Sequence, residues 1–133
     1  IDGIDIDWEF PSNAEQKQNY AAMLSELREQ LGAKYLLTIA APAGPQDYTD
    51  VAWDKIARDL DWINLMTYDF AGSWSSTTGF DAPLFASSSD PSKGKNAKAY
   101  NDNATVQAYI AAGVPADKLL LGVPFYGRGW TES

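Results

Sequence analysis

The chain has 133 residues, of which 45% are hydrophobic, and its 18 acidic and 10 basic side chains give a net charge of −8. This length suits one domain or part of one, and the acidic balance argues against nucleic acid or an anionic membrane surface as a partner. Cysteine and histidine are both absent, which excludes disulfides and thiol nucleophiles and leaves carboxylates and tyrosines to carry any proton chemistry.

The first predicted element is a strand over residues 1–9 that carries a row of acids. Asp5, Asp7 and Glu9 alternate with large apolar residues. Because side chains alternate faces along a strand, the three acids are expected on one face at steps of about 6.6 Å. Acids are depleted from strands, and the apolar opposite face argues against an edge strand with a merely solvated surface. The pattern therefore predicts a strand that carries a catalytic acid into a site.

The spacing of the acids gives each one an expected place. Neighbouring carboxylates do not all ionise at low cost, so one of them tends to keep a proton near neutral pH. A retained proton is what a general acid needs to protonate a leaving oxygen. Glu9 is the best candidate because it is last on the strand and nearest the mouth of a parallel sheet. Asp7 lies one step below it, and Asp5 lies deeper.

The rest of the chain alternates between helical and strand patterns. Ser12 and Glu15 predict a capping box that opens a helix ending at Gly32. Residues 71–102 predict a long loop, which at that length is usually functional or disordered. Alternation of strands and helices is typical of a parallel α/β sheet. The other predicted elements are strands at 36–41, 61–68 and 119–126 and helices near 50–60 and 104–112.

Three ordered motifs resemble one enzyme family. Residues 2–9 (DGIDIDWE) resemble the signature of the family 18 glycoside hydrolases, the chitinases and their relatives, with every defined position filled. Residues 64–69 (NLMTYD) and 122–130 (GVPFYGRGW) resemble two further segments of that family, in the same order. Residues 79–85 resemble a fourth segment, which often has histidine where this chain has Phe80.

The resemblance implies a (β/α)8 TIM barrel, which typically needs about 250 residues. Four βα units amount to about half of such a barrel, and they match its fourth to seventh strands. Residues 1–133 are therefore expected to be a partial catalytic barrel domain that contains the 71–102 loop. The chain is either a fragment of a longer enzyme or a half-barrel that dimerises. Both outer strands then have open edges, so self-association is expected.

The resemblance also implies roles for the acids. Glu9 protonates the glycosidic oxygen, while the 2-acetamido oxygen of the substrate, rather than an enzyme carboxylate, attacks the sugar. Asp7 stabilises the charged intermediate, Asp5 tunes that pair, and Tyr68 holds the acetamido group. A core hydrogen bond for Tyr68 is the alternative interpretation.

Further residues are implied to bind substrate at the ends of the last two strands and in the loop. Alternatives stay open for three of them. The arginine could instead pair structurally with the acidic row, the loop tryptophan could only pack on its neighbours at the rim, and Trp130 could only cover the top of the barrel. The substrate-binding candidates are Asp69, Met66, Tyr126, Arg128, Trp74 and Trp130.

The implied partner is chitin or an N-acetylglucosamine oligosaccharide, with no cofactor. An endo-β-N-acetylglucosaminidase acting on glycans and a non-catalytic sugar-binding relative are the alternatives. Such non-catalytic relatives usually lose the terminal glutamate, whereas Glu9 is present. A metal site is also disfavoured, because acids about 6.6 Å apart along a strand are too spread to share one ion at roughly 2.1–2.5 Å.

The sequence contains no run of 18 apolar residues, so no membrane-spanning helix is predicted. The chain opens directly with a strand pattern, and no signal-peptide pattern is expected in it. The resemblance to the family implies a secreted, extracellular protein.

Overall fold

A computed structural model describes residues 1–92 and 98–131. Its four strands pair in parallel in the order β1-β2-β3-β4, with successive strands adjacent. This arrangement confirms the predicted parallel α/β sheet. The strands are β1 (Gly3–Ile6), β2 (Leu36–Ala41), β3 (Trp62–Leu65) and β4 (Leu119–Leu121).

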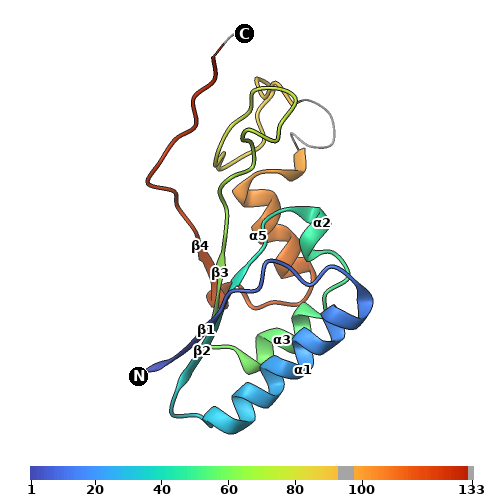
Figure 1. Cartoon of the computed structure of the whole chain (residues 1–133), viewed down its shortest axis with the longest axis vertical. Coiled ribbons are helices and arrows are strands. Elements are labelled where there is room, and N and C mark those ends of the chain that lie inside the picture. Colours follow the sequence, from blue (N-terminus) through green and yellow to red (C-terminus); the bar gives the residue numbers. More distant parts are fainter. Residues whose placement is uncertain (93–97, 132–133) are drawn as a thin grey trace.

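The helices of the described residues lie on one side of the sheet, and none of them covers the other face (Figure 1). One covered face and one inner face are what half of a (β/α)8 barrel presents, as expected from the sequence. Residues 66–92 contain no helix or strand, and part of the predicted 71–102 loop, 93–97, lies outside the described residues. The helices are α1 (Ala14–Leu31), α2 (Pro45–Tyr48), α3 (Trp53–Asp59), α5 (Asp102–Ala111) and the short 3-10 helix η1 (Ala116–Lys118).

The hydrophobic core lies between the sheet and the helices. Alternate residues of β2 and β3 point into it and are fully buried, and Ile6 and Trp8 of the first segment pack against it. Their position confirms that the apolar residues between the acids face away from the acidic row. The buried strand residues are Leu37, Ile39, Ala41, Ile63 and Leu65.

Three strands end earlier than predicted, and their ends form the rim of the sheet. β1 ends at Ile6 instead of residue 9, β3 at Leu65 instead of 68, and β4 at Leu121 instead of 126. Pro42 follows the last residue of β2, which lies between β1 and β3, and proline has no amide hydrogen to continue the ladder. The predicted site residues beyond these ends therefore leave the sheet and lie at its mouth.

The start of α1 differs from the predicted capping box by one residue. Asn13 is the N-cap, and its side chain accepts a hydrogen bond from the Gln16 backbone amide at 2.9 Å. The Gln16 side chain reaches back to the amide of Ser12 at 2.8 Å. The two side chains thus bond in both directions, as in a capping box. Asn13 and Gln16 form these bonds in place of Ser12 and Glu15, because asparagine caps a helix at least as well as serine.

No helix among the described residues is both long enough and apolar enough to pass through a bilayer.

Helix α5 begins on a buried acid. The Asn101 side chain caps the helix by accepting from the Ala104 amide at 2.9 Å, and the next residue, Asp102, is only 6% exposed. Among the described residues Asp102 Oδ1 has no hydrogen-bond partner. Burial raises the pKa of Asp102 to about 6, so ionisation of this side chain opposes folding.

We expect Asp102→Asn to stabilise the protein at pH 7 by about 1–2 kcal/mol. The folded pKa lies above the unfolded value, so the wild-type protein loses stability as pH rises from about 4 to about 6. The variant should lack that loss, and the two proteins should converge below about pH 4. Urea unfolding across this pH range measures the difference, and a gap that is constant with pH would contradict the assignment.

Residues 1–133 expressed alone are expected to self-associate or to be poorly soluble. The strands β1 and β4 each have one neighbour in the sheet, so each presents an unpaired edge. The inner face adds exposed apolar side chains, since Leu36 and Leu120 are 40% and 44% exposed. Size-exclusion chromatography with light scattering tests this, and a soluble monomer at high concentration would argue against it.

Candidate active site

Asp5 is held within the sheet rather than at its mouth. It pairs in register with Thr38 of β2, whose hydroxyl donates a hydrogen bond to Asp5 Oδ1. The Asn64 side-chain amide of β3 donates to the same oxygen at 3.3 Å. Asp5 therefore links three neighbouring strands on the inner face, and it is not among the residues that line the cleft described next.

A cleft of about 350 Å³ lies at the carboxyl ends of the strands. It collects Asp7 and Glu9 from beyond β1 together with residues that follow β3. The sequence predicted that these residues meet, because the carboxyl ends of parallel strands share one edge. Predicted site residues that line the cleft are Asp7, Glu9, Met66, Tyr68 and Asp69.

Tyr68 is half-buried and lines the cleft together with Asp7, Glu9 and Asp69. Burial and the negative charges of Asp7, Asp69 and Glu9 raise its pKa above the usual range. A tyrosine is already protonated at neutral pH with its ordinary pKa, and this shift only strengthens that state, so the phenol is able to donate a hydrogen bond into the cleft. Its hydroxyl makes no hydrogen bond within the described residues, which disfavours the alternative of a core hydrogen bond.

Asp69 is the centre of a second polar cluster. Its Oδ1 accepts hydrogen bonds from the Tyr126 hydroxyl at 2.8 Å and from Arg128 Nε at 3.1 Å, and a further one from Arg128 Nη2. Burial opposes ionisation of Asp69, but these donors outweigh it and lower its pKa. Burial and the bond to Asp69 raise the pKa of Tyr126 to about 12. The cluster is thus an ionised carboxylate held by two side chains from beyond β4.

Arg128 does not pair with the acidic row, which was one alternative from the sequence. Among the described residues its salt bridges go to Asp69 and Asp81. Its guanidinium also lies over the ring of Trp74, 4.8 Å from the centroid. Trp74 is 62% exposed, so its ring is accessible, and Trp130 is 39% exposed but lines neither the cleft nor the hollow beside it.

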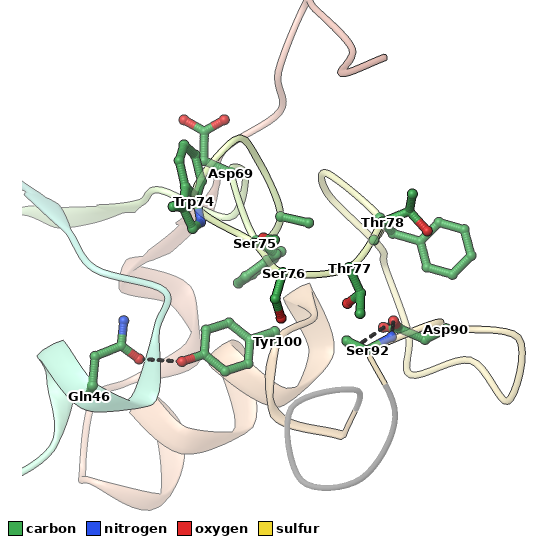
Figure 2. A pocket seen from close by; sticks show the side chains of 14 residues that line it. Gln46, Asp69, Trp74, Ser75, Ser76, Thr77, Thr78, Asp90, Ser92 and Tyr100 are labelled. Atoms are coloured by element: carbon green, nitrogen blue, oxygen red, sulfur yellow. Dashed lines mark hydrogen bonds between the residues drawn. The ribbon is translucent and has the colours of Figure 1, made fainter. Parts of the chain in front are cut away.

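A second hollow of about 460 Å³ adjoins the cleft and shares Gln46, Asp69, Phe70 and Tyr100 with it. Figure 2 shows the hydrogen-bonded pair of Gln46 and Tyr100 at one end and the pair of Asp90 and Ser92 at the other. Its wall carries the hydroxyls of residues 75–78. This hollow is larger than the cleft, but the acids of the first segment do not line it.

Sequence reasoning missed part of the lining. Gln46 follows β2, and its side-chain oxygen accepts a hydrogen bond from the Tyr100 hydroxyl at 2.6 Å. Asp47 and Phe10 also line the cleft. The position of Gln46 and Asp47 after a predicted strand was a usable signal, whereas Tyr100 arrives from the end of the long loop and has no local signal.

Gly122 allows the ends of β3 and β4 to approach each other. Its amide donates to Leu65 O at 2.9 Å, and its carbonyl accepts from the buried Thr67 hydroxyl at 2.8 Å. A Cβ atom at this position would lie 2.4 Å from Leu65 O and 2.9 Å from the Tyr68 ring. A side chain here would push apart the two strand ends that place Tyr68.

We expect Gly122→Ala to destabilise the protein by about 1–3 kcal/mol, the usual cost of overpacking, and to displace Tyr68 from the cleft. Gly127→Ala is the matched control, because a Cβ at Gly127 meets nothing within 4 Å. Thermal unfolding and a spectrophotometric titration of the tyrosines compare the two. Equal behaviour of both variants would show that the close approach at Gly122 is not needed.

Fold and site together define part of a (β/α)8 barrel with its carboxylates at the carboxyl ends of the strands. The sequence matches Glycosyl hydrolases family 18 over residues 1–133, and the chain belongs to this family, as its motifs predicted. Chitinase 1 of Aphanocladium album is 47% identical over 142 residues, an alignment that covers 100% of this chain and 33% of that protein.

Two solved structures are similar to the chain. A chitinase from Trichuris suis superposes with a TM-score of 0.89 at 32% identity, covering 99% of this chain and 37% of that one. A variant of catalytic domain 2 of the Ostrinia furnacalis Group II chitinase, in complex with (NAG)5, superposes with a TM-score of 0.84 at 33% identity and covers 93% and 34%. The chain spans about a third of the length of these relatives.

Proposed function

We propose that this chain supplies the reacting-sugar side of a chitinase active site, which hydrolyses β-1,4 bonds between N-acetylglucosamine units. The observation that carries the proposal is the convergence of Asp7, Glu9 and Tyr68 in one cleft. Relatives named chitinases, one of them bound to (NAG)5, support chitin oligosaccharides as the substrate class. Chitin is an extracellular polymer, so we also infer that the protein is secreted.

The proposed reaction retains configuration and uses the substrate's own acetamido group. Glu9 gives its proton to the glycosidic oxygen as the bond to the anomeric carbon breaks. The acetamido carbonyl oxygen forms the new bond to that carbon, giving an oxazolinium ion. Water then attacks the anomeric carbon, the ring of the oxazolinium opens, and Glu9 takes the proton from the water.

The neighbouring residues stabilise the charge that develops in this sequence. Asp7 accepts a hydrogen bond from the acetamido N–H and offsets the positive charge of the oxazolinium ion. Tyr68, whose pKa is raised above its usual range, is protonated at neutral pH and donates to the same group. Asp5 is hydrogen-bonded to Thr38 and Asn64 within the sheet, and it fixes the end of the strand that leads to Asp7. Asp69 and Met66 contact the bound sugar.

In the full-length protein, Glu9→Gln should lower turnover of N-acetylglucosamine oligomers by at least about 10²-fold, because the general acid is lost. Oligomer binding, measured by calorimetry, should persist because the amide keeps the shape of the side chain. Glu29→Gln on the exposed surface of α1 is the control and should leave both quantities unchanged. Near-normal turnover in Glu9→Gln would remove Glu9 from the mechanism.

Substrate assistance predicts that an oligomer with a free 2-amino group at the cleaved sugar is not hydrolysed there. A thiazoline analogue of the bicyclic intermediate should inhibit, because the site is complementary to the intermediate's shape and charge. Product analysis on partly deacetylated oligomers measures the first effect, and inhibition kinetics the second. Efficient cleavage after glucosamine units would instead indicate a conventional two-carboxylate mechanism.

A further inference from the structure

Asp81 is a buried carboxylate that the mechanism leaves without a role. Its side chain is 15% exposed, and within the described residues neither carboxylate oxygen has a hydrogen-bond partner. Its one close cationic neighbour there is Arg128, whose Nε lies 3.3 Å from Asp81 Oδ1. A buried charge is costly unless it is paired, and Arg128 is the cation that pairs with Asp81.

Arg128 joins Asp81 to the cleft. The same Nε donates to Asp69 Oδ1 at 3.1 Å, and the guanidinium lies over Trp74. A guanidinium is planar, with its donors in a rigid fork, so contacts on two carboxylates and one ring restrict its orientation. Removing one contact frees the plane to rotate away from the others.

The backbone places Asp81 for this contact. The amide of Phe70, the residue after Asp69, donates to the carbonyl of Asp81 at 3.0 Å. Asp69 itself has a positive φ of 59°, a conformation that aspartate tolerates better than most residues. The loop and the end of the β3 segment are therefore fastened together where both carboxylates meet Arg128.

We propose that Asp81 is a positioning residue that holds the Arg128 guanidinium against Asp69 and Trp74. The part of the inference that concerns glycan binding rests on the proposed function. Arg128 and Trp74 do not line the cleft that contains Glu9, so the loss of Asp81 should weaken binding rather than slow the chemical step. Asp81→Asn should raise KM about tenfold, the scale of one partly buried ion pair, and change kcat by less than about twofold.

A double-mutant cycle in the full-length protein separates positioning from general damage. In a Glu9→Gln background, calorimetry measures the Kd for the N-acetylglucosamine pentamer. Asp81→Asn should weaken binding about tenfold when Arg128 is present and hardly at all in combination with Arg128→Gln. Equal weakening in both backgrounds would overturn the proposal. Asp54→Asn, which removes the exposed ion pair with Arg58, is the control and should not change the Kd.

A second measurement does not depend on the substrate. The Nε–H resonance of Arg128, assigned by its loss in Arg128→Gln, should move toward the free-arginine position in Asp81→Asn and stay in place in Asp54→Asn. An unmoved resonance in Asp81→Asn would overturn the proposal. If Asp81→Asn does not fold, Asp81→Glu tests the same contact: the resonance should stay displaced, and a free-arginine position would contradict it. Absence of pentamer binding by the parent protein would refute the proposed function alone.

Discussion

Parallel pairing of the strands is the constraint on which the site depends. Because all four strands run the same way, the residues after β1, β2 and β3 leave the sheet at one edge. Pro42 ends the central ladder, and the bonds of Gly122 to Leu65 and Thr67 join the next two strand ends. The cleft lies where these ends meet. Residues separated by some sixty positions in the chain, such as Glu9 and Tyr68, become its neighbouring walls.

The polar groups divide into two clusters with different chemistry. Asp7 and Glu9 are exposed at the mouth of β1, with no cation paired to them among the described residues. Asp69 is bonded to Tyr126 and Arg128 and is held as an ion. Tyr68 lies beside both and feels the charge of both. We propose that the first cluster transfers protons and that the second binds a neutral, hydroxyl-rich ligand.

Much of this arrangement follows from local patterns. The alternation in residues 4–9 predicted an acidic face opposite a packed face, and the order of strands and helices predicted the parallel sheet. The ends of β1, β3 and β4 were predicted too far along the chain. The strand propensity of a residue does not indicate where the neighbouring strand stops forming hydrogen bonds. The helix cap was misplaced by one residue because Ser12 and Asn13 are both good caps and only the backbone angles decide between them.

The contacts of the loop were beyond local reasoning. Residues 79–85 were noted for their resemblance to a family segment, but nothing in the sequence indicates that Asp81 meets Arg128 across 47 positions. The same holds for Tyr100 and Gln46. Such pairs depend on the path of an irregular segment, which has no periodicity to read. The alternative that Arg128 pairs with the acidic row was wrong for this reason, because its salt bridges among the described residues go to Asp69 and Asp81.

A crystal structure of full-length Glu9→Gln with a bound N-acetylglucosamine oligomer tests the central claim most directly. We expect a glycosidic oxygen within hydrogen-bond distance of the residue 9 side chain, with one acetamido group against Asp7 and Tyr68. The aglycone sugars should extend past Asp69 toward Trp74. An oligomer bound only in the second hollow, with no sugar beside residue 9, would contradict the assignment of the cleft as the active site.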